Sequence, residues 1–255
     1  FCAQSIHYDC DINTHPMLSS ERILAGAKQA EANGAHRYCV VTSGDRLSRQ
    51  DFATVLRAVT AIKEETSLKR CVSLGRLDSN EIEELVAAGL NRCHHNLETA
   101  RSYYPKICTT HKYENRLETI EKLKSAGIEL CVGGIFNLGE SDRQRLEFAF
   151  EIAATEPDSV PINFLNPRPG TPLAGRPPME TWEAVKFIAL FRFIMPKAII
   201  RLAAGRCEAL GRDQRLGIEA GVNGLLIGDY LTTSGNDINK DFELLDNLGF
   251  DSLRS

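Results

Sequence analysis

Residues 124–136 read KSAGIELCVGGIF, and this stretch contains the join between a helix and a buried strand. Apolar side chains recur at helical spacing before it, and Gly127 stands where the end of a helix needs the left-handed conformation. The apolar run 129–135 that follows has the length of a strand. The same pattern of a glycine between a helix and an apolar run recurs in the segments EANGAHRY at 31–38, VAAGLNRC at 86–93 and EAGVNGLL at 219–226. The repeated join predicts a chain of alternating helices and strands.

The same periodicity extends outward over the whole chain. Helices are expected at 20–33, 50–65, 79–88, 113–126, 141–154, 181–194 and 212–220. Strands are expected at 36–41, 71–74, 91–97, 129–135, 159–165, 199–203 and 224–227. Strict alternation implies a parallel sheet. With a first unit that is incomplete in this chain, the count closes at eight, which predicts an α/β fold of the (β/α)8 TIM-barrel type, as a single domain over 1–255.

A doubly wound open sheet is the structural alternative, although no GxGxxG fingerprint or P-loop follows any expected strand. Composition limits the function in a similar way. The 255 residues carry 30 basic and 34 acidic side chains, a net charge of -4 without a basic face for nucleic acid. No apolar stretch is long enough for a membrane span, and the start at Phe1 has no signal-peptide pattern. We therefore expect a cytoplasmic protein with a small-molecule substrate.

Eight cysteines without a secretion signal favour metal or redox chemistry over disulfides. Cys39, Cys71 and Cys131 occupy equivalent places on three expected strands. A single strand cysteine is usually a small buried hydrophobe. Three of them on alternate strands of a barrel would converge, and converging thiolates suit an iron-sulfur cluster. Arg201 lies on a later apolar strand, where it either faces inward toward an anionic partner or lies outward between helices.

Polar side chains also gather at two strand ends. In HHNLET, residues 94–99, strand alternation sends His94, Asn96 and Glu98 to one side. An amide and a carboxylate there are suited to a ribose or a ureido group. Asn163, in PINFLNPRPGTPL, has a similar setting before a rigid loop. The ordinary alternative is a core histidine with satisfied hydrogen bonds, or an asparagine paired to backbone.

Taken in order, the segments FCAQS, RYCVVTSG, HNLET, CVGGIFNLGE, PINFLNPRPGTPL, RLAAGR and YLTT resemble the biotin synthase family of radical S-adenosylmethionine (SAM) enzymes over essentially the whole length. The resemblance implies that Cys2 is the third cysteine of a CxxxCxxC motif. That motif would hold the 4Fe-4S cluster that cleaves SAM, with an incomplete ligand set in this chain.

The same resemblance assigns roles to further residues. Cys39, Cys71, Cys131 and Arg201 match the ligands of a second, sulfur-donating cluster of 2Fe-2S type. The SAM-binding positions are Thr42, Asn96, Glu98 and Ile135. The dethiobiotin-binding positions are Asn96, Asn163, Thr232 and Thr233. The implied reaction is the last step of biotin biosynthesis, in which a radical formed from SAM abstracts hydrogen from dethiobiotin and cluster sulfide is inserted.

Some features depart from the family pattern. His94 stands where some relatives have an asparagine, and Ala203 replaces a hydroxyl residue of some members. Cys207 is additional, and as a fourth thiolate it would support a 4Fe type of second cluster. The resemblance also implies an electron donor such as flavodoxin or ferredoxin and a homodimer. Two alternatives stay open: another radical SAM enzyme of the hydrogenase-maturation or methylornithine-forming type, and a non-catalytic barrel that binds iron-sulfur or zinc.

Overall fold

The computed structural model describes residues 2–5, 7–11, 15–230 and 235–250. The chain divides into two compact units, which are described separately. Among the described residues, one unit comprises 15–95 and 115–130, and the other comprises 2–5, 7–11, 96–114, 131–230 and 235–250. One division falls after His95. A second falls after Glu114, in the first turn of a helix, and a third falls between Leu130 and Cys131, inside a strand. The expectation of a single domain stays a prediction.

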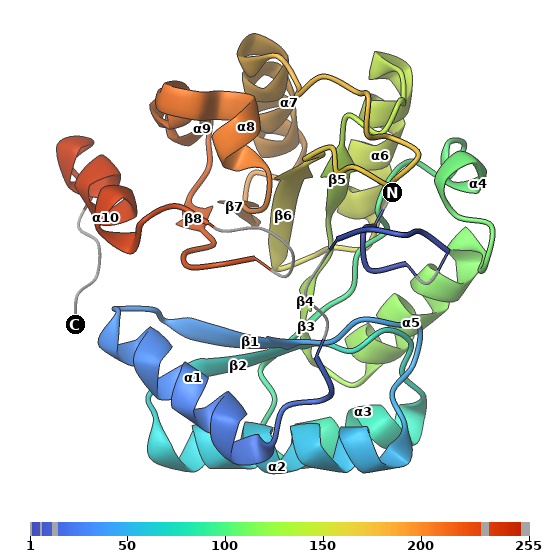
Figure 1. Cartoon of the computed structure of the whole chain (residues 1–255), viewed down its shortest axis with the longest axis vertical. Helices are drawn as coiled ribbons and strands as arrows, with labels where there is room; N and C mark the ends of the chain where they lie inside the picture. The colour runs from blue at the N-terminus through green and yellow to red at the C-terminus, as the bar shows by residue number, and fades with distance from the viewer. Residues whose placement is uncertain (1, 6, 12–14, 231–234, 251–255) are drawn as a thin grey trace. The chain divides into compact units, whose positions relative to one another are not determined.

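The unit that contains residues 15–95 alternates helices and strands from its start (Figure 1). Its elements are α1 (Ser20–Ala32), β1 (Arg37–Val41), α2 (Arg49–Glu65), β2 (Lys69–Ser73), α3 (Ser79–Ala87), β3 (Arg92–His94) and most of α5 (Tyr113–Ser125). β1 pairs with β2 and β2 with β3, both in parallel. Side chains of Ser19, Ser48 and Asp78 cap the first three helices by accepting backbone N–H groups. Each helix therefore begins where its sequence provides a cap.

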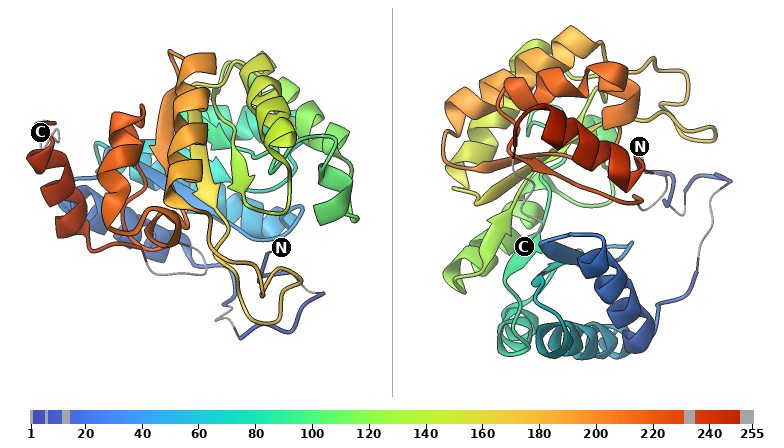
Figure 2. Two further views of the ribbon diagram at one scale, coloured as in Figure 1. Left: turned by 90° about the horizontal axis from the view of Figure 1, so that it is seen from above. Right: turned by 90° about the vertical axis from the view of Figure 1, so that its left-hand side faces the viewer.

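The other unit contains the remaining parallel strands and the helices that follow them (Figures 1 and 2). Its elements are α4 (Tyr104–Ile107), the end of β4 (Glu129–Cys131), β5 (Gly134–Phe136), α6 (Asp142–Ala154), β6 (Ser159–Phe164), α7 (Thr181–Ile194), β7 (Ile199–Leu202), α8 (Arg206–Leu210), the 3-10 turn Gly211–Asp213, α9 (Gln214–Glu219), β8 (Gly224–Leu225) and α10 (Ile238–Asn247). The strand order is β4-β6-β7-β8, and β5 also pairs with β6.

The side chains of β6 alternate between two faces of the sheet in the second unit. Val160, Ile162 and Phe164 on β6 alternate with Ser159, Pro161 and Asn163, and all three apolar side chains are buried. Phe164 joins an aromatic cluster with ring centroids 5.4–6.3 Å apart. The other members come from β5, α6 and α7: Phe136, Phe148, Phe187 and Phe191. The apolar face packs on helices, so the opposite face remains for polar residues.

The expected elements agree closely with the structure. All seven expected helices are present with ends within two residues, and the observed strand pairs are parallel. The glycines at the four repeated joins, Gly34, Gly89, Gly127 and Gly221, all have positive φ, as a helix end of this kind requires. The expected strand 129–135 is instead two strands, β4 and β5, separated at 132–133. The short helices α4 and α8, and also α10, were not expected. Among the described residues no helix is long and apolar enough to cross a membrane.

Candidate functional site

Cys39 and Cys71 lie side by side on neighbouring strands. They are paired in register between β1 and β2, so both side chains extend from the same face of the sheet. The next pair, Val40 and Val72, is buried on the opposite face. Cys71 is 2% exposed and Cys39 is partly exposed. The expectation that these cysteines lie on alternate strands is wrong, because β1 and β2 are direct neighbours.

Cys131 and Arg201 meet in the other unit. Arg201 Nη2 lies 2.8 Å from Cys131 Sγ, and Cys131 is fully buried. Arg201 pairs in register with Pro161, and Cys131 pairs with Ser159. All four therefore belong to one face of the sheet, opposite the face of β6 that packs on helices. The Arg201 guanidinium therefore lies beside the Cys131 sulfur and does not point outward between helices.

Ser159 is a residue that the sequence reasoning did not single out. It is fully buried, and its Oγ has no hydrogen-bond partner among the described residues. A buried hydroxyl in this state is uncommon and fits a site that receives a further acceptor. Its position next to Cys131 in the β4–β6 register places that hydroxyl beside a candidate ligand. The alternation of Ser159, Pro161 and Asn163 along one strand was the available signal.

Asn96 and Glu98 are held together by the segment that follows β4. Asn96 Nδ2 donates to Glu98 Oε2 at 3.3 Å, and Asn96 Oδ1 accepts the Gly133 N–H at 3.2 Å. Glu98 has a φ of 72°, an uncommon conformation for this residue, and its carbonyl accepts the Ile135 N–H at 2.8 Å. Such backbone strain is concentrated at functional sites. The side chains of Asn96 and Glu98 meet through this hydrogen bond, and not through strand alternation, because β3 ends at His94 and Glu98 is not extended.

Asn163, on β6, bonds through its amide to β5 and to the residues that follow β7. Its Nδ2 donates to Gly134 O at 2.9 Å, and its Oδ1 accepts the Ala204 N–H at 3.2 Å. Ile135 on β5 is its register partner. The ordinary alternative, an asparagine bonded to backbone, is therefore observed. An amide has two N–H groups and two lone pairs. The two backbone bonds use one N–H group and one lone pair, so one N–H group and one lone pair remain for a ligand.

Gly133 and Gly134 permit these contacts because neighbouring backbone lies very close to them. A Cβ at Gly133 would lie 2.2 Å from Pro161 O, and a Cβ at Gly134 would lie 2.3 Å from Glu98 O. No residue with a side chain fits at either place without moving the backbone. The glycine pair therefore brings Asn96, Glu98 and Asn163 to one segment.

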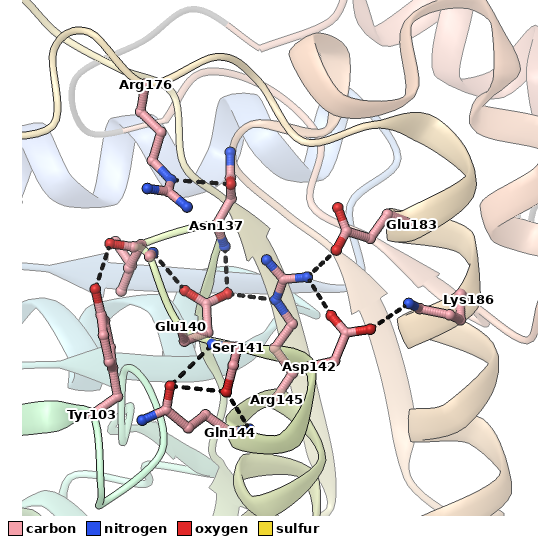
Figure 3. A network of polar contacts seen from close by, with 12 residues as sticks. Tyr103, Asn137, Glu140, Ser141, Asp142, Gln144, Arg145, Arg176, Glu183 and Lys186 are labelled. Carbon is pink, nitrogen blue, oxygen red and sulfur yellow. Dashed lines mark hydrogen bonds and ion pairs between the residues drawn. The ribbon is translucent and has the colours of Figure 1, made fainter.

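A network of charged side chains fixes the loop after β5 (Figure 3). Glu140 is buried and accepts hydrogen bonds from Asn137 N at 2.7 Å and from Arg145 Nε at 2.7 Å. Arg145 also pairs with Glu183 at the start of α7. The Asn137 side chain donates to Pro177 O at 2.8 Å. The network joins β5, α6, α7 and the loop before α7, and so it holds the strand end that carries Ile135.

The remaining candidate residues make contacts of their own. Cys2 is exposed, and Thr42, in the other unit, donates its N–H to Ser73 O at 3.0 Å. Cys207 on α8 donates its thiol to Asn236 Oδ1 at 3.0 Å, and burial raises the pKa of this thiol. Thr232 and Thr233 lie outside the described residues. Within the described part of the chain, no group of three or more His, Cys, Asp or Glu side chains has the arrangement of a metal site.

Comparisons with known proteins identify the family of this chain. Residues 1–152 match the family model "Radical SAM superfamily", and residues 161–251 match "Biotin and Thiamin Synthesis associated domain". The chain is similar to the biotin synthase of Acetivibrio thermocellus, with 45% identity over 98% of this chain and 78% of that protein. It is 47% identical to the biotin synthase of Pelotomaculum thermopropionicum over 97% of this chain and 77% of that protein.

Solved structures show the fold. The crystal structure of methylornithine synthase superposes with a TM-score of 0.81 at 22% identity, covering 94% of this chain and 75% of that one. The hydrogenase maturase HydG from Carboxydothermus hydrogenoformans superposes with a TM-score of 0.78 at 18% identity, covering 95% of this chain and 63% of that one. The TIM-barrel type of α/β fold is thereby confirmed, and the doubly wound alternative is excluded. The matched models and the identity to curated relatives show that the chain belongs to the biotin synthase family of radical SAM enzymes.

Proposed function

We propose that this protein inserts sulfur into dethiobiotin to form biotin, with Cys39, Cys71, Cys131 and Arg201 as the ligands of a sulfur-donating auxiliary cluster. The contact of Arg201 Nη2 with Cys131 Sγ carries the proposal. An arginine beside a buried cysteine has no ordinary role in a strand core, where a guanidinium needs an anionic partner. A thiolate bound to iron supplies that partner.

The donor chemistry of the residues fits an iron-sulfur cluster. Thiolates are the usual protein ligands of such clusters, and three cysteines with one arginine give a set of soft donors and one unusual ligand. The unpartnered Ser159 hydroxyl, next to Cys131 in register, can donate to a sulfide. We propose a 2Fe-2S cluster without Cys207, because the Cys207 thiol donates to Asn236 and burial favours its protonated form.

The SAM-cleaving cluster is of the 4Fe-4S type, with Cys2 as the cysteine of its motif in this chain. We assign Asn96 and Glu98 to the ribose of SAM, Thr42 to its methionyl part and Ile135 to its adenine. The strained Glu98 and its bond to Asn96 support the first assignment, since both side chains are oriented before a ligand arrives. When bound, SAM and the clusters supply the hydrogen abstraction and the sulfur.

The protein's own contribution is to hold dethiobiotin. Asn163 offers one N–H and one lone pair beyond its two backbone bonds, which complements the C=O and N–H groups of a ureido ring. Asn96 would contact the same ring, and Thr232 and Thr233 would receive the carboxylate. Because Asn163 is immobilised by Gly134 and Ala204, its remaining groups are fixed in direction.

The wider assignments follow from the family. We propose a homodimer, an electron donor of the flavodoxin or ferredoxin kind, and a cytoplasmic location. None of the eight cysteines, all in the described part of the chain, forms a disulfide, which agrees with a reducing compartment. Size determination by light scattering and reduction assays with each donor would test these assignments.

The proposed function is tested by replacing the auxiliary ligands in the full-length protein. Cys39→Ala, Cys71→Ala and Cys131→Ala should each abolish biotin formation, whereas SAM cleavage persists. Iron content and the visible spectrum report cluster loss, and Cys93→Ala provides a control at a buried strand cysteine outside the ligand set. A triple variant that still converts dethiobiotin to biotin would refute the ligand assignment. Sulfur insertion into another substrate, with none into dethiobiotin, would favour a different radical SAM activity.

A further inference from the structure

A cysteine outside the candidate site lies in a small cluster of hydrogen-bonding groups. Cys108 directly follows α4, and its side chain is partly exposed. Its Sγ lies 3.6 Å from Thr110 Oγ1 and 3.6 Å from each ring nitrogen of His111. The Tyr104 side chain also forms a hydrogen bond with the sulfur. All four residues belong to the same compact unit.

The threonine and the histidine of this cluster also contact each other. Thr110 Oγ1 lies 3.0 Å from His111 Nδ1. A hydroxyl can accept one hydrogen bond while it donates another, so Thr110 can accept from His111 and donate its proton to the Cys108 sulfur. The His111 ring makes an edge contact with Tyr104, with 6.1 Å between the ring centroids. The groups around the sulfur therefore hold one another in place.

The hydrogen bonds of this cluster favour the charged form of the thiol. Burial alone would raise the pKa of Cys108, but hydrogen bonds from Tyr104 and Thr110 lower it, and the net pKa lies below its ordinary value. Cys207 is the opposite case in the same unit and is also partly exposed. Its thiol donates to Asn236 Oδ1 at 3.0 Å, and burial raises its pKa. The two thiols thus differ in how readily they become thiolates.

The surroundings of Cys108 also allow a small reagent to approach. Lys106, Thr110 and Lys112 are exposed. The two lysines add positive charge close to Cys108 in the chain, and positive charge favours a thiolate. The ordinary alternative is a neutral thiol that donates to His111 O, 3.7 Å from the sulfur. The two alternatives predict different reactivity, because the thiolate is the nucleophile and the thiol is not.

We propose that Cys108 is a nucleophilic residue that forms mixed disulfides with low-molecular-weight disulfides, and that Thr110 and His111 activate it. The Cys108 thiolate attacks one sulfur of the reagent, and the S–S bond of the reagent breaks. A new S–S bond joins Cys108 to one half of the reagent, and the other half leaves as a thiolate. Cys108 is oxidised and the leaving sulfur is reduced, so the reaction needs no further oxidant. This modification site is independent of the proposed sulfur insertion.

The test measures the rate of this reaction at single cysteines. Full-length protein is incubated anaerobically with oxidised glutathione over a range of pH values, and peptide mass spectrometry identifies each residue that carries the adduct. Thr110→Val removes the hydroxyl beside the sulfur at nearly constant size. His111→Phe keeps an aromatic ring next to Tyr104 but removes the ring nitrogens. Thr109→Val is the matched control, because Thr109 is an exposed neighbouring threonine whose hydroxyl is not one of the groups described around the sulfur.

At neutral pH, Cys108 should form the adduct about tenfold faster than Cys207, because its larger thiolate fraction outweighs the lower intrinsic nucleophilicity of a more acidic thiol. The rate at Cys108 should also rise at a lower pH than the rate at Cys207. Thr110→Val and His111→Phe should both move this rise to higher pH, and Thr109→Val should leave it in place. Equal rates at Cys108 and Cys207, or a pH profile that Thr110→Val does not change, would overturn the proposal and leave Cys108 as an ordinary loop thiol.

Discussion

Asn163→Ala should impair both folding stability and dethiobiotin binding, by separate amounts. The Asn163 amide makes two hydrogen bonds to backbone, with Gly134 O and with the Ala204 N–H, at 2.9 and 3.2 Å. Alanine leaves both backbone groups without this partner. Each loss costs about 1–2 kcal/mol, so the free energy of unfolding should fall by about 2–4 kcal/mol. Urea denaturation monitored by circular dichroism measures this change.

Binding is affected by the groups of Asn163 that remain available to the ligand. Loss of a buried partner for the ureido ring should cost about 1–3 kcal/mol, which weakens dethiobiotin binding about 5- to 150-fold. SAM binding should change little. Equilibrium dialysis of each ligand against the anaerobic full-length protein, at a temperature where the variant is folded, separates the two effects.

Asn91→Ala is the control for Asn163→Ala. Asn91 accepts the Arg70 N–H at 2.8 Å through its side chain, so it is another asparagine that bonds to strand backbone. This variant should lose about 1–2 kcal/mol of stability without any specific loss of dethiobiotin binding. Equal weakening of dethiobiotin and SAM in Asn163→Ala would show a general folding defect and refute the reading of Asn163 as a ureido-binding residue.

Three further predictions concern the surroundings of the site. Gly134→Ala should destabilise the fold strongly, whereas Gly175→Ala, where an added Cβ meets nothing within 4 Å, should be tolerated in the same thermal unfolding assay. Burial raises the pKa of Glu151 above its ordinary value of 4.5, so this group adds stability at low pH that is lost as pH rises through the raised pKa. Glu151→Gln should therefore flatten this part of the plot of unfolding free energy against pH. An unchanged slope would contradict the raised pKa of Glu151. Cys207→Ser should leave the iron content and spectrum of the auxiliary cluster unchanged, and a smaller cluster would restore Cys207 as a ligand.

Sequence periodicity predicted the main elements because local preferences and burial agree along most of this chain. It failed where backbone contacts from distant segments decide the structure. The expected strand 129–135 is interrupted because Gly133 bonds to the Asn96 side chain and leaves the ladder. The short helix α8 begins at Arg206, whose burial depends on Asp241, 35 residues later. Neither partner is visible in a local window.

The candidate site, too, could be predicted from the sequence only in part. The resemblance assigned Cys131 and Arg201 to one ligand set together with Cys39 and Cys71, and the structure shows a contact between Cys131 and Arg201. The sequence left open whether Asn163 bonds to backbone and could not name the groups it bonds to, and it did not predict the unpartnered hydroxyl of Ser159, because both depend on which strand lies next to β6. Strand order and register are long-range properties, and a single sequence does not specify them residue by residue.

The register pair of Cys39 and Cys71 has a consequence for protein engineering. Two thiols on neighbouring parallel strands are spaced by the backbone ladder, at about 4.8 Å between strands, and not by a loop. Shifting them apart would require one strand to slip by two residues, since a slip of one residue turns a side chain to the other face. If the proposed ligand assignment holds, half of that site can be transplanted to another barrel by placing cysteines at one register position of two adjacent strands. The distance between the two cysteines would then be set by the strand spacing of the host sheet.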